Sequence, residues 1–141
     1  MLSHPMTRAR RALLISTSIV AAAAAITACG EEGISSSLKG SDLQAAQLFN
    51  SRCSGCHTLA VAGTQGSATN VRTREYKDGP NFDQRHETPN CVLYAIRNGG
   101  FSSGPMPQNI VTGPNAELLA RFVSKYSKPA SGTTPRDCPA G

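Results

Sequence analysis

Aromatic side chains are scarce in this sequence. Tryptophan is absent from the 141 residues, and phenylalanine and tyrosine bring the aromatic share to only 5%. Large aromatic rings supply much of the apolar area that a small domain buries. A chain of this length forms one domain at most and has little with which to fill a core alone. The composition therefore favours a domain that is completed by a bulky buried group.

Paired metal ligands are also few. The five cysteines include a single C-x-x-C pair, Cys53 and Cys56, and His57 follows it directly. A zinc site of the usual kind needs four protein ligands, commonly from a second cysteine or histidine pair. A thioredoxin-like dithiol is expected beside a strand-helix-strand pattern. Here the residues before Cys53 favour a helix and those after it favour a long polar loop, so both alternatives are disfavoured.

C-x-x-C-H is typical of c-type haem attachment. If one helical turn carries the motif, positions i, i+3 and i+4 share a face, so both thiols and the imidazole point toward the same group. Each sulfur can then bond one vinyl of the porphyrin while the imidazole ligates the iron. The motif predicts one covalently bound haem c, held by Cys53, Cys56 and His57.

The first 28 residues have no acidic side chain and read as an export signal. Arg8, Arg10 and Arg11 precede an apolar run over residues 12–28, which is the order of a signal peptide. The run ends in Ile-Thr-Ala-Cys, which resembles the lipobox of bacterial lipoproteins, so we expect Cys29 to be lipidated and to become the first residue. An uncleaved anchor is the alternative, because 17 apolar residues lie at the short end of what spans a bilayer. Either form tethers the domain to a membrane.

The positive charge of the chain belongs largely to this signal. Its removal takes away three of the 14 basic residues and none of the nine acidic ones, and leaves a formal net charge of +2. A charge this small gives no support to nucleic-acid binding.

The mature chain divides into three parts. Residues 29–40 are rich in serine, glycine and acidic residues and are expected to form a flexible tether. Residues 41–128 form the domain, and residues 129–141, rich in Pro, Ser, Thr and Gly, form an irregular tail.

Apolar periodicity predicts three helices in the domain. The first begins at Asp42 behind Ser41 as a capping residue and leads into the C-x-x-C-H motif. The second has Thr88 as a cap and Pro89 at its first position, carries an apolar face over residues 91–98 and is stopped by the glycines after them. The third follows Pro114, and residues 58–81 are expected to form a loop without a convincing strand.

The helix leading into C-x-x-C-H, a later Gly-Pro-Asn, a short helix, a methionine followed by proline and a final helix resemble, in this order, the small monohaem (class I) cytochromes c. The resemblance covers about residues 41–127 and implies a mainly α fold of three to four helices around one haem. It implies Met106 as the second axial ligand and the carbonyl of Pro80 as the acceptor for the other nitrogen of His57. It also implies that the first and last helices cross closely, at Ala45 and Phe49 against Leu119 and Phe122.

A separate observation favours Met106 as a ligand. Met106 is the only methionine left once residues 1–28 are removed, and it stands between two prolines in a loop. A methionine that merely fills a core is expected on the apolar face of a helix. The competing ligand is His86, which its polar neighbours predict to be exposed to solvent.

Cys91 and Cys138 remain once the other cysteines have roles. An exported protein folds in an oxidising compartment, so cysteine arithmetic favours a disulfide between them. The bridge would attach the tail to the middle helix.

These features predict a monomeric electron carrier and not an enzyme. It would be lipid-anchored on the extracytoplasmic face of a bacterial membrane, where it would pass single electrons between larger redox complexes. A haem-based gas sensor that releases Met106 is one alternative, and the electron-accepting subunit of a dehydrogenase is another.

Overall fold

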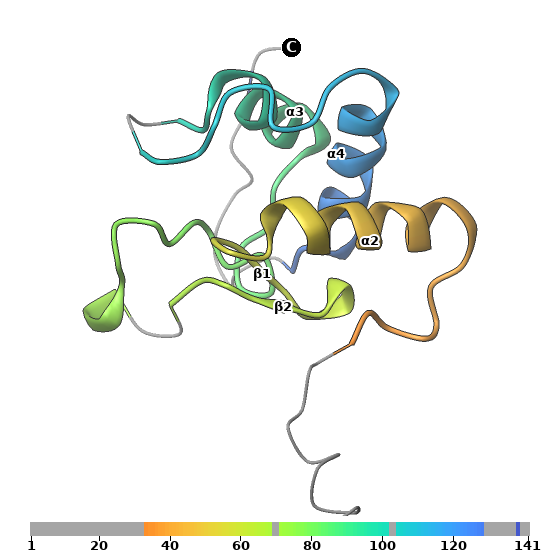
Figure 1. Ribbon diagram of the computed structural model, residues 1–141, viewed down its shortest axis with the longest axis horizontal. Coiled ribbons are helices and arrows are strands. Elements are labelled where there is room, and N and C mark those ends of the chain that lie inside the picture. The colour runs from red at the N-terminus through yellow and green to blue at the C-terminus, as the bar shows by residue number, and fades with distance from the viewer. Residues whose placement is uncertain (1–32, 69–70, 102–103, 129–137, 139–141) are drawn as a thin grey trace, which may run out of the picture. The chain divides into compact units, whose positions relative to one another are not determined.

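The computed structural model describes residues 33–68, 71–101, 104–128 and 138. Over this part of the chain the protein is mostly helical, with one small two-stranded sheet, and the predicted mainly α class is confirmed in this coarse form. The helices are α2 (Gly40–Cys53), α3 (Pro89–Asn98) and α4 (Pro114–Tyr126), and the strands are β1 (Thr58–Leu59) and β2 (Thr64–Gln65). Two 3-10 turns, η2 (Ala60–Ala62) and η3 (Val71–Thr73), complete the described elements (Figure 1).

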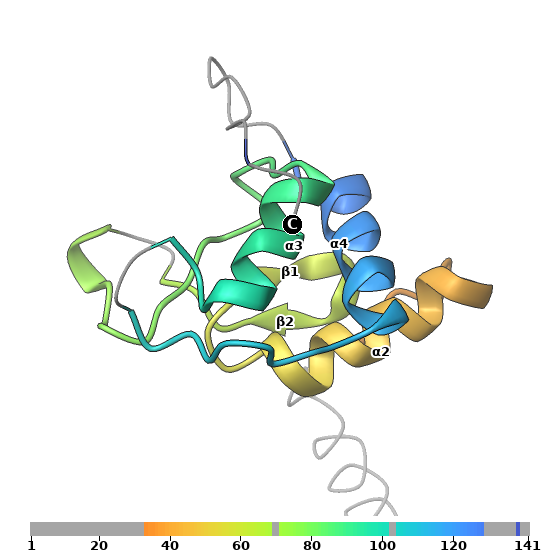
Figure 2. The ribbon, with the colours of Figure 1, turned by 90° about the horizontal axis from the view of Figure 1, so that it is seen from above.

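Helix α4 packs against both other helices and lies between them in Figure 2. Phe49 of α2 and Leu119 and Phe122 of α4 belong to one buried cluster. Ala45 is completely buried, so its small side chain allows the two helices to approach closely. At the solvent edge of this pair, Lys125 and the Tyr126 hydroxyl both donate to Asp42 Oδ2, at 2.7 and 2.8 Å. The four positions at which a close helix crossing is expected are therefore buried together.

The ends of α3 follow the chemistry of its sequence. The Thr88 hydroxyl accepts a hydrogen bond from the backbone N–H of Cys91 at 3.3 Å, and Pro89 occupies the first helical turn. Gly99 ends the helix in the left-handed conformation, with φ of 74°. The predicted cap, the proline at the start of the helix and the stop are all confirmed.

Two local predictions are wrong. Helix α2 begins at Gly40 with Lys39 as its N-cap, and no side chain caps it, so Ser41 does not have the predicted role. The expected loop over residues 58–81 contains the β1–β2 hairpin, in which Leu59 pairs with Thr64. Strands of two residues are too short to show the alternation that identifies a strand in sequence.

The domain also begins earlier than residue 41. Leu38 is only 4% exposed, and Ile34 packs against the same core. The backbone N–H of Ser35 donates to the carbonyl of Val61 at 3.0 Å. The predicted tether is therefore too long at its C-terminal end, because its apolar side chains, Ile34 and Leu38, pack against the core.

Several predictions fall on residues outside the described ranges. These are the signal over residues 1–28, the lipidation site Cys29 and most of the tail over residues 129–141. In the ranges that are described, no helix combines the length and apolar character that crossing a membrane requires.

Candidate functional site

A cavity of about 850 Å³ lies beside the end of α2. This volume falls within the range of roughly 300–1,000 Å³ that is usual for small-molecule and cofactor sites. Its walls come from α2, the segment over residues 74–87, α3, residues 99–101 and 104–106, and α4. Many of the wall residues are apolar, among them Phe49, Phe82, Val92, Ile96, Leu119 and Val123.

The C-x-x-C-H motif forms one more helical turn at the end of α2. The regular helix ends at Cys53, and the backbone N–H groups of Cys56 and His57 both donate to the Cys53 carbonyl, at 3.2 and 2.9 Å. Cys53 and His57 line the cavity, whereas Cys56 is half-buried and is not among the lining residues. The motif therefore brings one thiol and the imidazole to the cavity wall, and the second thiol does not line it.

The two thiols of the motif are free. Burial, with a smaller contribution from Cys56, raises the pKa of Cys53 to about 12. A dithiol oxidoreductase needs a thiolate at neutral pH, which depends on a lowered pKa. The environment of Cys53 therefore disfavours the thioredoxin-like alternative on physical grounds.

One nitrogen of the His57 ring is engaged by the backbone. Nδ1 lies 3.2 Å from the carbonyl oxygen of Pro80, so Nδ1 carries the proton and donates, and Nε2 keeps its lone pair. Burial lowers the pKa of His57, and the hydrogen bond to Pro80 opposes this effect. The ring also stacks on Phe82, with centroids 5.1 Å apart. The result is a neutral, oriented imidazole, which is the form that binds a metal.

Gly79 lies against this ring. Its N–H donates to the Cys56 carbonyl at 2.7 Å, which ties the segment to the motif. A Cβ at position 79 would lie less than 3.0 Å from His57 Cε1, Nδ1 and Nε2. The glycine of the Gly-Pro-Asn sequence is thus needed for space beside the imidazole.

Ser67 is a site residue that the sequence did not reveal. Its hydroxyl lies 3.0 Å from the Pro80 carbonyl, to which it donates, and it accepts from the backbone N–H of Thr58 at 2.9 Å. The Pro80 oxygen therefore receives donors from both Ser67 and His57. An isolated serine in a polar loop gives no sequence signal for such a role, because the contact depends on how β1 and β2 fold back.

Met106 lines the cavity from a different segment of the chain and is half-buried. An added Cβ at Gly99 would lie 2.8 Å from the Met106 carbonyl oxygen, and one at Gly100 would lie 3.8 Å from its sulfur. After the loop, the N–H of Asn109 donates to the Ile96 carbonyl at 2.8 Å. Contacts with the end of α3 therefore position the thioether, and His57 and Met106 line one cavity.

The alternative ligand His86 lies elsewhere. Its Nδ1 is 3.1 Å from the Ser127 hydroxyl and 3.3 Å from the Ser127 carbonyl, and it does not line the cavity. The ring is half-buried, so the predicted exposure to solvent is wrong. Contacts with the end of α4 cover it, which local polarity in the sequence could not indicate.

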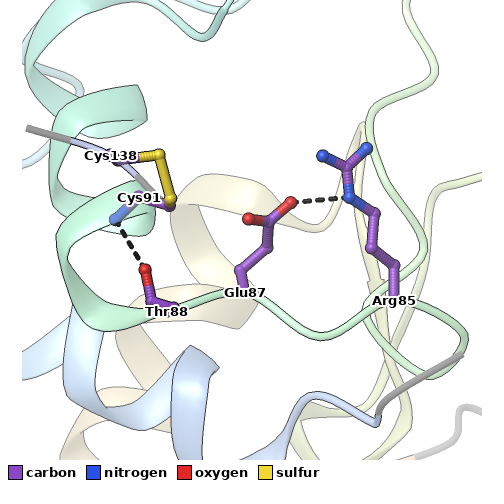
Figure 3. The surroundings of a disulfide bond; sticks show 5 residues. All are labelled: Arg85, Glu87, Thr88, Cys91 and Cys138. Carbon is purple, nitrogen blue, oxygen red and sulfur yellow. Dashed lines mark hydrogen bonds and ion pairs between the residues drawn. A yellow bond between two sulfur atoms is a disulfide. The ribbon is translucent and has the colours of Figure 1, made fainter. Parts of the chain in front are cut away.

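Cys91 and Cys138 form a disulfide, with their Cα atoms 5.0 Å apart (Figure 3). This is the pair that cysteine arithmetic predicts. Cys91 is buried and lines the cavity at the start of α3. The bridge therefore attaches position 138 to the wall of the site.

Among the described residues, no group of three or more His, Cys, Asp and Glu side chains is placed to hold a metal ion. No family model, curated protein or solved structure matches the chain. The site is therefore interpreted from its own chemistry.

Proposed function

We propose that the protein is a membrane-attached c-type cytochrome that carries one electron at a time on a single haem. One observation supports this function above the others. His57, with Nδ1 already bound to the Pro80 carbonyl, and Met106, from a loop far along the chain, line the same cavity. Two side chains of the kinds that ligate haem iron, from segments far apart in the sequence, are thus brought to one cavity.

The residues of the cavity fit a haem. Its volume of about 850 Å³ and the many apolar residues in its wall suit a large flat cofactor. Cys53 and Cys56 would bond the vinyl groups, Nε2 of His57 would ligate the iron, and the Met106 sulfur would be the second axial ligand. Cys56, half-buried in the turn after α2, would have to turn toward the cavity to take part.

A haem in this cavity would supply one-electron chemistry. Two protein ligands would leave no position open for oxygen or peroxide, so the electron would be transferred without bond formation. The soft Met106 thioether favours the reduced state. Pro80, Ser67 and Gly79 hold the His57 ring in one orientation.

The membrane attachment belongs to the same proposal. Lipidation of Cys29 would place the domain on the extracytoplasmic surface, within reach of a donor and an acceptor complex. Cys29→Ser is expected to abolish incorporation of labelled fatty acid into the protein. Unchanged labelling of this variant would contradict the proposed anchor, and membrane retention without label would favour an uncleaved signal.

Extraction with acidified acetone tests the covalent haem directly. Haem from the purified wild-type protein is expected to stay with the polypeptide, because thioether bonds survive this treatment. The single variants Cys53→Ser and Cys56→Ser are expected to keep at most one thioether, and Ser54→Ala serves as a control within the same turn. Free haem in the extract, or a haem-free zinc protein, would overturn the proposal.

A further inference from the structure

Glu87 is an unusual residue of the cavity wall. Its side chain is only 6% exposed, and it lines the cavity just before α3. One carboxylate oxygen, Oε1, accepts from Arg85 Nε at 2.6 Å. The other oxygen, Oε2, has no hydrogen-bond partner. Among the described residues it is the one buried side-chain nitrogen or oxygen atom that lacks a partner.

An ionised carboxylate oxygen without a donor is costly to bury. Figure 3 shows that the single ion pair to Arg85 leaves the second oxygen on the opposite side of the carboxylate. The side chain of Arg85 is 44% exposed, so solvent screens its electrostatic attraction to the Glu87 carboxylate. A proton on Oε2 would lower this cost, because a neutral carboxyl group is less costly to bury than a charged one.

Among the described residues, Arg85 is the ion-pair partner of Glu87. The nearby half-cystine Cys91 does not titrate, and the Ser127 hydroxyl, beyond α4, accepts from the backbone N–H of Glu87 at 3.3 Å. The His86 ring is directed to Ser127. The more distant charged residues of the cavity wall are Arg74, Glu75, Lys77 and Asp78. Two ion pairs of Lys77, with Glu75 at 3.2 Å and with Asp78 at 3.4 Å, partly neutralise that group.

We propose that Glu87 is a proton site linked to the redox state of the cavity, an inference that rests on the function proposed above. Glu87 takes up one proton from solvent, at Oε2, when a one-electron donor protein reduces the cofactor. It returns that proton to solvent when the electron passes to the acceptor. Each cycle thus moves one electron through the protein and moves one proton on and off Glu87.

The physical basis is that the charge of the Glu87 carboxylate and the charge of the cofactor affect each other equally. A negative carboxylate beside the cavity stabilises the more positive, oxidised state, and the added electron in turn favours a neutral Glu87. Because reduction takes up a proton, the midpoint potential must fall as pH rises. If one proton is taken up for each electron, the ratio of reduced to oxidised protein at a fixed potential changes tenfold per pH unit. This corresponds to a shift of about 59 mV in the midpoint potential of a one-electron couple.

The test is a redox titration of the holoprotein at a series of pH values. The wild-type potential is expected to fall with pH, and Glu87→Gln, which keeps the shape but cannot titrate, is expected to lose this part of the slope. Glu75→Gln is the matched control, because it removes a cavity-wall carboxylate that is 67% exposed. Any slope due to the carboxyl groups of the cofactor remains in both variants.

A second measurement covers the case in which Glu87→Gln fails to fold. Redox difference infrared spectra of the wild-type protein are expected to show a carboxylic-acid band, sensitive to deuterium, that appears on reduction. Arg85→Gln is expected to move the pH-dependent region to higher pH, because the opposing positive charge is lost. Equal slopes in wild type and Glu87→Gln, or no such band in a protein with covalent haem, would overturn the inference alone. Absence of covalent haem would instead overturn the proposed function.

Discussion

The backbone of Gly79 lies against the face of the His57 imidazole, so closely that a methyl group at position 79 would overlap three ring atoms. Gly79→Ala is therefore expected to tilt the ring away from the Pro80 carbonyl. Overpacking of this kind costs about 1–3 kcal/mol of unfolding free energy. Denaturant unfolding and the fraction of protein that carries haem are the measurements, and both are expected to fall.

Gly55→Ala is the matched control for this variant. Position 55 lies inside the motif, and no atom lies within 4 Å of an added Cβ there. This change is expected to leave haem content and stability nearly unaltered. Equal losses in the two variants would show that the contact between Gly79 and His57 has no special weight.

Ser67 supports the same histidine through the Pro80 carbonyl. Ser67→Ala removes one of two donors to that oxygen and leaves the buried N–H of Thr58 without its acceptor. An unsatisfied buried group costs about 1–3 kcal/mol. Unfolding experiments are expected to show this loss, whereas Ser51→Ala, at an exposed position of α2, is expected to change little. A neutral Ser67→Ala would mean that water replaces the hydroxyl.

The disulfide between Cys91 and Cys138 closes a long loop, with the two cysteines 47 positions apart in sequence. The double variant Cys91→Ser/Cys138→Ser is expected to lose about 2–4 kcal/mol of stability in the chain-entropy model. Mass spectrometry of peptides digested without reduction is expected to detect the linked pair. Two thiols that react with an alkylating agent in freshly prepared protein would contradict the bridge.

The contact between Asp42 and Lys125 predicts a pH dependence of stability. Hydrogen bonds from Lys125 and then Tyr126 lower the pKa of Asp42. The carboxylate therefore stabilises the fold above the unfolded-state pKa of about 3.9, and the effect is lost as pH falls through the lower folded-state pKa. Asp42→Asn is expected to reduce stability near neutral pH and to match wild type in strong acid.

The control for this prediction is Glu117→Gln, which removes the exposed partner of Arg121 on α4. Denaturant midpoints measured as a function of pH are expected to separate the two variants. If Asp42→Asn lowers stability equally at every pH, packing and not charge explains its effect.

The helices could be predicted from the sequence because they depend on local apolar spacing and capping. The disulfide pair could be predicted because only two cysteines remained without another role. The hairpin was missed because its strands are too short to alternate, and the start of the domain was placed too late. Ser67 and Glu87 were missed for a different reason. Each acts through residues distant in sequence, and nothing in its own neighbourhood distinguishes it from a surface residue. The domain starts early because Ile34 and Leu38 pack on the core, and two isolated apolar residues in a polar stretch did not indicate this in the sequence.

The sixth ligand separates a carrier from a sensor, and carbon monoxide binding to the reduced protein measures it directly. The proposed carrier would keep Met106 on the iron in both redox states, so the wild-type protein is expected to bind carbon monoxide slowly and incompletely. Met106→Ala is expected to open the site, bind the gas readily and lower the potential, while the exposed neighbour variant Gln108→Ala behaves as wild type. Fast and complete binding by the wild-type protein, or unchanged behaviour of Met106→Ala beside a strong effect of His86→Ala, would contradict this account.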